Sequence, residues 1–159
     1  MRILGIDPGL ANCGWGVIES HGSRLRPVAY GCISTVAAEE LPARLRTIAH
    51  ELRDVVRRYQ PTDLGIETVY QKGNQKSAIA TAQARGAALT AAAELEMCIG
   101  EYSPSTIKNA VVGSGSASKE QVQYMVQVLL RLDHLPNPDH AADALAAAIC
   151  HAHLRRAPR

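Results

Sequence analysis

The chain has 159 residues, of which 47% are hydrophobic and 20% are charged, and its formal net charge is +2. This length fits one domain with a full core, and the small net charge does not by itself indicate a nucleic-acid partner. The sequence lacks the charged start and apolar run of a signal peptide and any apolar stretch long enough to span a bilayer. We therefore expect a soluble, cytoplasmic protein with no membrane partner.

The positions of the cysteines and the absence of linkers or repeats in the sequence give two further expectations. The four cysteines lie far apart in the chain and form no CxxC pair, which favours reduced core thiols over disulfides or a zinc site. They are Cys13, Cys32, Cys98 and Cys150. No linker or repeat divides the chain, so we expect one domain over residues 1–155 and a mobile tail at residues 156–159.

Three strands open the predicted fold. Residues 1–7 (MRILGID) read as a buried strand that ends at Asp7. A short Pro-Gly turn then leads into residues 13–20, which should pair with the first strand as an antiparallel hairpin. Residues 25–35 form a third strand. Residues 38–59 carry apolar side chains at helical spacing with charges between them, which predicts an amphipathic surface helix.

The middle of the chain alternates strands with a helix. Residues 62–70 form a short apolar run that Glu67 interrupts, and we predict a fourth strand there. Residues 71–76 are a polar, basic loop. An Ala-rich helix over residues 77–95 and a fifth strand over residues 98–103 follow.

Helices complete the chain. A short one starts at about Ser105, and the next is capped by Ser118, with Gln121 at capping-box spacing. For the last helix we predict Asn137 as the N-cap and Pro138 as the first helical residue. This order of elements predicts a layered α/β domain.

Acidic residues stand in positions where a carboxylate is costly. Asp7 and Glu67 each lie in an otherwise apolar strand, and a buried charge is expensive unless it is paired or bound to a metal. Asp143 lies near the start of the last helix, where the helix dipole tolerates an acid. His140, three residues earlier, and Asp139, four residues earlier, can share its side of the helix.

This donor set favours a particular metal chemistry. Carboxylates with at most one imidazole and no thiolate suit Mg²⁺ or Mn²⁺ better than zinc. Two such ions about 4 Å apart can activate a water and stabilise the leaving oxygen of a phosphodiester. Each acid alone is also compatible with a plain turn, edge or cap residue. Two acids inside apolar strands together with a polar helix start favour the metal site.

Three motifs carry a resemblance to a known family. GIDPGLANCGWGV, then GIETVY with QARG downstream, and finally DHAADALAAAICH occur in this order along nearly the whole chain. The sequence closely resembles the RuvC family of Holliday junction resolvases. The resemblance implies a ribonuclease H-like fold: a central mixed five-stranded sheet, its first three strands antiparallel, flanked by helices. It also implies a homodimer that resolves four-way DNA junctions by two symmetric nicks, with Mg²⁺ or Mn²⁺, two ions per active site.

The resemblance also assigns the site, residue by residue. Asp7 matches the acid of the first strand, Glu67 that of the fourth strand, and Asp143 the last acid of the helix motif. His140 stands where many relatives have Asp and others have His. The resemblance therefore implies that these four residues are catalytic and bind metal, with His140 acting as a ligand or helping to activate the attacking water. Asp139 is the rival for its position.

Polar residues after Glu67 are candidates for DNA contacts. An aromatic side chain among lysines suits base stacking with phosphate contacts around it, although a tyrosine packed at a strand end is the plainer alternative. The candidates in this loop are Tyr70, Lys72, Asn74, Gln75 and Lys76. Lys108 and Lys119 fall where the family has basic residues near DNA, and two solvated lysines are the competing interpretation.

Some features support further expectations. The Ala-rich helix offers small residues for a homodimer contact, although burial against the sheet is an alternative. Gly14 and Gly16, on one face of the second strand, allow a backbone or a phosphate to approach closely, unless they only serve turn and bulge geometry. His151 and His153 are expected to be solvated. The family resemblance also implies a link to branch-migration motor proteins.

Two functions other than a nuclease are compatible with parts of the sequence. Actin-like or sugar-kinase-like ATPases share a related strand–Asp–x–Gly opening, but they enclose a nucleotide between two such domains and this chain supplies one. A junction-binding module without catalysis is the third candidate. Replacing Glu67 by Gln separates it from the nuclease, because only a nuclease loses nicking while it keeps binding.

Overall fold

A computed structural model describes residues 1–69 and 74–155. Its centre is one five-stranded sheet with strand order β3-β2-β1-β4-β5. The strands are β1 (Arg2–Asp7), β2 (Asn12–His21), β3 (Arg24–Ser34), β4 (Asp63–Glu67) and β5 (Cys98–Tyr102). The pairs β1–β2 and β2–β3 are antiparallel, whereas β1–β4 and β4–β5 are parallel. The mixed sheet with three antiparallel strands first is as predicted.

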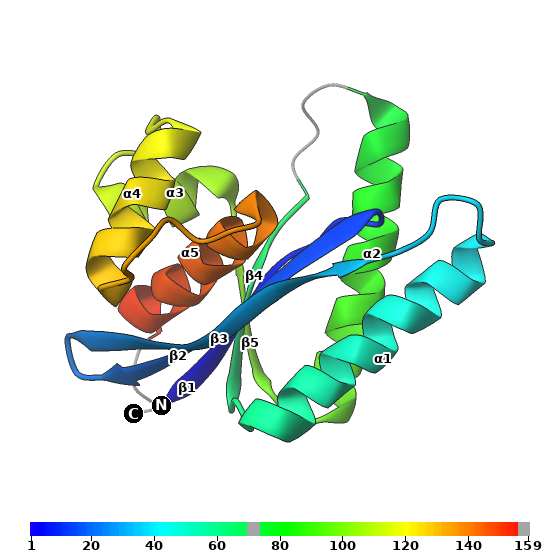
Figure 1. Cartoon of the computed structure of the whole chain (residues 1–159), viewed down its shortest axis with the longest axis horizontal. Coiled ribbons are helices and arrows are strands. Elements are labelled where there is room, and N and C mark those ends of the chain that lie inside the picture. Colours follow the sequence, from blue (N-terminus) through cyan, green and yellow to red (C-terminus); the bar gives the residue numbers. More distant parts are fainter. Residues whose placement is uncertain (70–73, 156–159) are drawn as a thin grey trace.

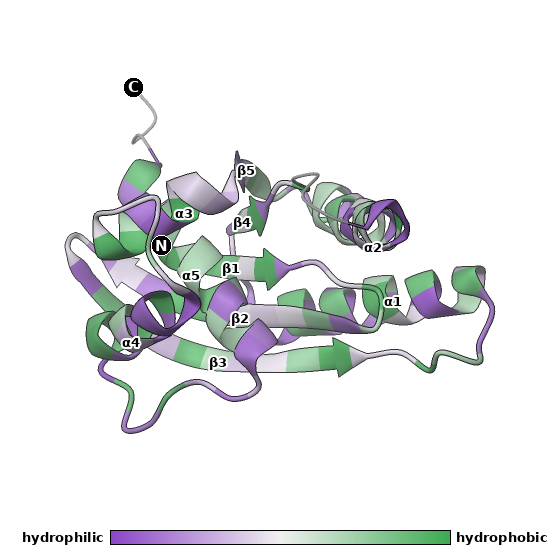
Figure 2. Ribbon diagram, turned by 90° about the horizontal axis from the view of Figure 1, so that it is seen from above, coloured by the Kyte–Doolittle hydropathy of each residue, from purple (hydrophilic) through white to green (hydrophobic). Residues whose placement is uncertain are grey.

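Five helices cover the two faces of the sheet. They are α1 (Leu41–Tyr59), α2 (Gln75–Glu94), α3 (Pro104–Val112), α4 (Lys119–Leu130) and α5 (Asp139–Leu154). Helices α3, α4 and α5 lie on one face, and α1 and α2 lie on the other (Figure 1). Figure 2 shows hydrophobic and hydrophilic bands alternating along α1, as expected for a helix with one buried side. None of the helices in the described ranges combines the length and the apolar character needed to cross a bilayer.

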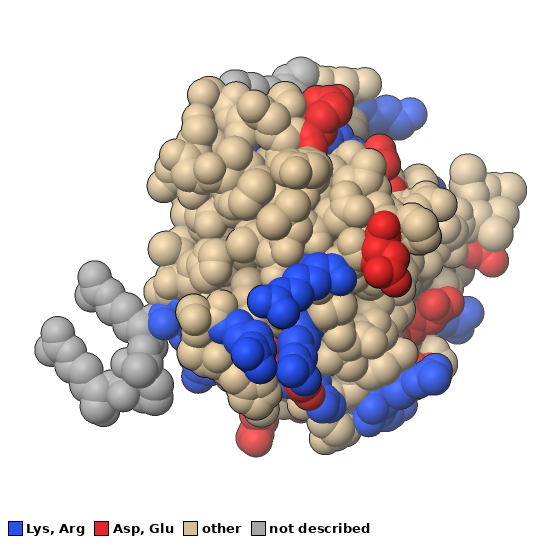
Figure 3. All heavy atoms as spheres, turned by 60° about the vertical axis from the view of Figure 1, so that its left-hand side comes forward, with Lys and Arg blue, Asp and Glu red and all other residues tan. Residues whose placement is uncertain are grey.

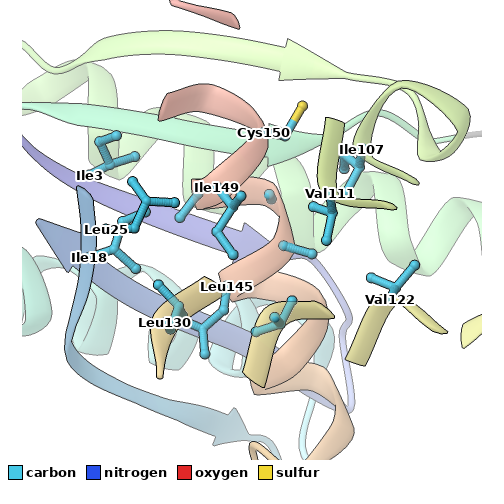
Figure 4. Close-up of a cluster of buried hydrophobic side chains, with 14 of the residues drawn as sticks. Ile3, Ile18, Leu25, Ile107, Val111, Val122, Leu130, Leu145, Ile149 and Cys150 are labelled. Atoms are coloured by element: carbon cyan, nitrogen blue, oxygen red, sulfur yellow. The ribbon is translucent and has the colours of Figure 1, made fainter. Parts of the chain in front are cut away.

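Two apolar cores result, one on each face. Ile3, Ile18 and Leu25 of the sheet pack under α3, α4 and α5, where Leu145 and Ile149 contribute from α5 (Figure 4). The second core joins alternate strand residues to α1 and α2. Because side chains alternate between the faces of a strand, β1, β2 and β3 each contribute to both cores.

Helix α5 lies unusually close to the sheet, because glycines stand beneath it. A Cβ atom on Gly5 or Gly65 would overlap the backbone of α5 at Ala144 or Ala147, and one on Gly14 would overlap the carbonyl of His140. Gly14 of the second strand therefore admits a backbone, which was one of the alternatives open from the sequence, whereas Gly16 makes room for the Leu145 side chain. The helix is alanine-rich and buried on nearly all sides for the same reason.

Several sequence predictions are wrong in detail. Pro138, in an extended conformation, is the N-cap of α5, and Asn137 does not cap the helix, which therefore begins at Asp139. The fourth strand ends at Glu67 instead of continuing to residue 70, and α2 begins at Gln75, inside the predicted loop. Cys98 is exposed, so the interpretation of all four cysteines as core thiols is too broad, although all four are free.

The remaining boundaries agree with prediction to within a few residues. Ser118 and Gln121 form the predicted capping box at the start of α4, since each side chain accepts a hydrogen bond from the other residue's backbone N–H. The tail expected at residues 156–159 lies outside the described residues.

Candidate active site

Two acids meet at one edge of the sheet because their strands are parallel neighbours. Asp7 is the last residue of β1 and Glu67 the last of β4, and the register pairs Ile6 with Ile66 just before them. Gly5 and Gly65, two residues earlier, face α5. Because side chains alternate along a strand, Asp7 and Glu67 point to the same face.

The start of α5 brings two more groups to this edge. His140 Nδ1 lies 2.9 Å from Asp7 Oδ2. Ligand atoms of Asp7, His140 and Asp143 all lie within 4.8 Å of one another, which is close enough for one cation to bind all three. Asp139 instead has a largely exposed side chain paired with Lys119, so it is His140 that lies against Asp7.

Glu67 stands beside this cluster and is electrostatically coupled to it. Burial, followed by the charges of Asp7 and Asp143, raises the pKa of Glu67 from 4.5 to about 7. Burial and Asp7 also raise the pKa of Asp143. Burial and mutual repulsion make it costly for these carboxylates to ionise together. A bound cation lowers this cost, because its positive charge offsets both the repulsion and the lost solvation.

Lys119 partly neutralises the cluster. Its ammonium group lies 3.3 Å from Asp143 Oδ2 and 3.4 Å from Asp139 Oδ2. Burial alone would lower the pKa of Lys119, but Asp143 and Asp139 raise it. The Lys119 side chain is 48% exposed, and its ammonium group pairs with two acids at the start of α5.

Two hollows flank Glu67. One, of about 300 Å³, lies between Asp7 and the start of α2 and is lined by polar residues such as Asn74 and Thr81. The other, of about 240 Å³, lies between α3, α4 and α5 and contains Lys108 and Lys119 beside Asp143. Acidic and basic side chains stand together at the top of the face seen in Figure 3, whereas most of its basic side chains gather lower down. Lys108 and Lys119 thus lie on one side of the acidic cluster.

The other predicted contact residues have varied positions. Asn74 caps α2, because its side chain accepts a hydrogen bond from the backbone N–H of Lys76, and it also lines the first hollow. Gln75 and Lys76 are exposed in the first turn of α2. Tyr70 and Lys72 lie outside the described residues.

The donor set fits hard divalent cations. Three carboxylates and one imidazole gather at one edge, with no thiolate among them, and oxygen donors of this kind suit Mg²⁺ or Mn²⁺. The structure therefore supports a candidate acidic metal site at the end of β1.

Sequence reasoning missed a second polar group at the opposite end of α5. Asp63 and His151, the latter predicted to be solvated, are both buried, and His151 Nε2 lies 3.2 Å from Asp63 Oδ1. Arg155 also pairs with Asp63 at 2.6 Å. Asp63 is an acid in an apolar strand, which is the same signal that singled out Glu67.

Comparisons with known proteins agree with this geometry. A family model described as "Crossover junction endodeoxyribonuclease RuvC" matches residues 3–151. A relative of the same description from Heliobacterium modesticaldum is 49% identical, over 96% of this chain and 94% of its own length. Another, from Bordetella petrii, is 53% identical, over 97% of this chain and 84% of its own length.

Solved structures extend the likeness. A chain described as "T. thermophilus RuvC in complex with Holliday junction substrate" superposes with a TM-score of 0.91 at 33% identity, covering 96% of this chain and 93% of that one. The Fowlpox virus resolvase bound to Holliday junction DNA has a TM-score of 0.62 at 15% identity, over 94% and 97% of the two chains, and shares the fold. The predicted ribonuclease H-like fold is confirmed.

Proposed function

The chain belongs to the RuvC family of crossover junction endodeoxyribonucleases, and from this premise we propose that Asp7, Glu67, His140 and Asp143 hydrolyse phosphodiesters of four-way DNA junctions. The enzyme is a hydrolase that resolves Holliday junctions in recombination and repair. The observation that carries the assignment of its active site is the convergence of Asp7, His140 and Asp143 within 4.8 Å, beside Glu67.

The four side chains would hold Mg²⁺ or Mn²⁺, two ions per site. When bound, such cations supply activation of a water molecule and stabilisation of charge on the leaving oxygen. Asp7 and Asp143 lie close enough to share one cation with His140. Glu67, which lines both hollows, would contribute its carboxylate to holding the second cation.

His140 is oriented by Asp7. Because Nδ1 lies 2.9 Å from Asp7 Oδ2, we assign Nε2 to cation binding or to accepting a proton from the attacking water. The Asp7 carboxylate fixes the orientation of the His140 ring, as the hydrogen-bond partners of metal-binding histidines commonly do.

DNA contacts would flank the site. We infer that Lys108 and Lys119, which line the second hollow with Asp143, contact phosphates. Asn74, Gln75 and Lys76, at the start of α2 on the other side of Glu67, are the proposed contacts there. Tyr70 and Lys72 retain the proposed roles of stacking on a base and contacting phosphate. We assign the enzyme to the cytoplasm, where bacterial DNA is available.

Paired nicks need two active sites. On α2, Ile79, Ala82, Gly86 and Ala93 are exposed at helical spacing, and this face of small residues suits a homodimer contact. Protomers exchanged between the unchanged enzyme and Glu67→Gln should yield mixed dimers that nick one strand only. An association with a branch-migration motor complex would couple these nicks to junction movement.

The deciding experiment compares a synthetic four-way junction with plain duplex. We expect nicking of the junction with Mg²⁺ or Mn²⁺ and none with chelator. Glu67→Gln should bind the junction as the unchanged enzyme does but lose nicking by about a hundredfold or more, as loss of a group acting in the transition state does. Unaltered nicking by this variant would refute the role of Glu67, and tight ATP binding would instead favour the ATPase alternative.

A further inference from the structure

Arg85, on the side of α2 that faces the sheet, contacts the main chain of an active-site residue. Its Nε–H donates a hydrogen bond to the Glu67 carbonyl oxygen at 3.1 Å. The same guanidinium group forms an ion pair with Glu101 of β5. We propose that Arg85 is a positioning residue that fixes the end of β4 and thereby holds the Glu67 carboxylate in the cation site.

The end of β4 needs such a restraint. Glu67 is the last residue of the strand, and its carboxylate stands beside the charges of Asp7 and Asp143. Repulsion among these groups favours a Glu67 side chain turned away from the cluster when no cation is bound. The bond from Arg85 opposes this movement by holding the carbonyl of Glu67.

A second contact holds the same peptide unit from the other side. The backbone N–H of Thr68 donates to the Tyr102 carbonyl oxygen of β5 at 2.8 Å. The peptide unit between Glu67 and Thr68 is therefore anchored twice, its carbonyl oxygen by α2 and its N–H by β5. Without the Arg85 contact, only β5 holds this peptide unit.

Arginine suits this position better than lysine. A planar guanidinium presents several N–H donors in fixed directions, so one edge can bind the Glu67 carbonyl while another binds Glu101. A lysine can satisfy one of these partners at a time. Because Glu101 neutralises the guanidinium, Arg85 is already engaged and adds little attraction for DNA phosphates.

The inference rests on the proposed cation-binding role of Glu67. The test therefore measures Mn²⁺ binding to the DNA-free protein by calorimetry, next to the Mn²⁺ concentration that gives half-maximal nicking. Arg85→Met should weaken Mn²⁺ binding about tenfold or more, which is the usual effect of losing a group that orients a ligand. Nicking at saturating Mn²⁺ should largely recover, and junction affinity in chelator should not change.

The chain offers a matched control. Arg53 of α1 makes a similar two-donor contact with Glu94 at the far end of α2, so Arg53→Met removes an ion pair of α2 that lies away from the site. It should leave Mn²⁺ binding unchanged. Should Arg85→Met fail to fold, Arg85→Lys keeps the charge and one contact, and we expect an intermediate loss of Mn²⁺ affinity.

Three results would overturn the inference. If Arg85→Met bound Mn²⁺ as tightly as the unchanged protein, the Arg85 contact would not position the Glu67 carboxylate. A loss of Mn²⁺ affinity in Arg53→Met as large as in Arg85→Met would mean a general effect on stability. A fall of about one in the salt slope of junction binding for Arg85→Met would mark a phosphate contact instead. Normal nicking by Glu67→Gln would refute the proposed function itself, a failure distinct from these three.

Discussion

The Glu67 carboxyl group makes folding depend on pH. Its pKa is about 7 in the folded protein, against 4.5 in the unfolded chain, because burial and then Asp7 and Asp143 disfavour its charge. The folded state therefore holds the proton more tightly, so its contribution to stability is present below pH 4.5 and is lost as the pH rises through 7. Above pH 7, the metal-free protein bears the full cost of the charge.

The first prediction follows at this residue. In chelator at pH 8, Glu67→Gln should melt about 2–8 °C above the unchanged protein, the shift that 1–2 kcal/mol produces in a domain of this size. At pH 4.5 the gain should disappear. Thermal unfolding followed by circular dichroism measures both, with exposed Glu39→Gln as a control that shows no gain. A Glu67→Gln protein less stable at pH 8 would contradict the electrostatic account.

Lys119 is expected to change partner when a cation binds. In the structure its ammonium group pairs with Asp143 and Asp139, which leaves it less available to phosphate. A cation held by Asp143 weakens this attraction and frees Lys119 for DNA. Lys108 forms no ion pair with any residue in the described parts of the chain, although its charge acts on Glu67, so we expect its contact with DNA to depend less on a cation.

The second prediction uses the salt dependence of junction binding. With Ca²⁺, which prefers the same oxygen ligands, Lys119→Met should reduce the slope of log K against log salt by about one. In chelator the same variant should leave the slope nearly unchanged. Lys108→Met should reduce the slope in both conditions. Equal effects of Lys119→Met with and without Ca²⁺ would exclude the change of partner.

At the scale of elements, the placement of α5 decides whether the site exists. His140 and Asp143 reach Asp7 because α5 rests on the backbone of β1, β2 and β4 at glycine positions. The last helix and Gly14 were each recognisable in the sequence, whereas Gly5 and Gly65 were not singled out. A glycine in a strand does not show whether a helix, a ligand or a turn approaches it.

The third prediction compares two strand glycines. Gly5→Ala would push a Cβ atom into the backbone of α5 at Ala144, whereas Gly31→Ala meets only the Trp15 ring, which can shift. We expect Gly5→Ala to lower the free energy of unfolding by about 2 kcal/mol or more and Gly31→Ala to change it by less than about 1 kcal/mol. Urea unfolding measures both, and equal losses would argue against close packing of α5.

Local signals explain which elements were predictable. Helical spacing of apolar residues marked α1, apolar runs marked β1 and β4, alanine content marked α2, and the Ser118–Gln121 box marked the start of α4. The predicted start of α5 is one residue too early. Asn is common at the N-cap and Pro at the first helical position, but here Pro138 itself takes the extended N-cap conformation. Capping depends on backbone angles that residue type alone does not determine.

Over the whole molecule, β4 links the two ends of α5. Asp63 and Glu67 lie four residues apart and so face the same side of the sheet, one meeting His151 and Arg155 and the other standing beside Asp143. The motifs in the sequence pointed to the residues that meet in the candidate active site. They did not point to the partner of Asp63, because only the tertiary fold brings residue 151 to residue 63.

The buried contacts of His151 with Asp63 and Tyr102 require a neutral imidazole ring. Asp63 accepts a hydrogen bond from Nε2–H, so Nδ1 can accept one from the Tyr102 hydroxyl, 2.9 Å away, only while the ring is neutral. Burial lowers the pKa of His151, although Asp63 opposes this. The unfolded chain therefore binds a proton at His151 more readily than the folded protein does.

The last prediction is a pH dependence of folding carried by His151. Because its folded pKa lies below the unfolded value of 6.5, its contribution to stability is present above pH 6.5 and is lost as the pH falls through the folded pKa. His151→Gln should cost about 1–3 kcal/mol at pH 7.5, since Asp63 loses a buried partner, and the cost should shrink toward pH 5. Urea midpoints at pH 5, 6 and 7.5 measure this, with exposed His153→Gln on the same helix as the control. A cost for His151→Gln that is constant with pH would mean that the ring contributes only packing, and the protonation account of this end of α5 would be wrong.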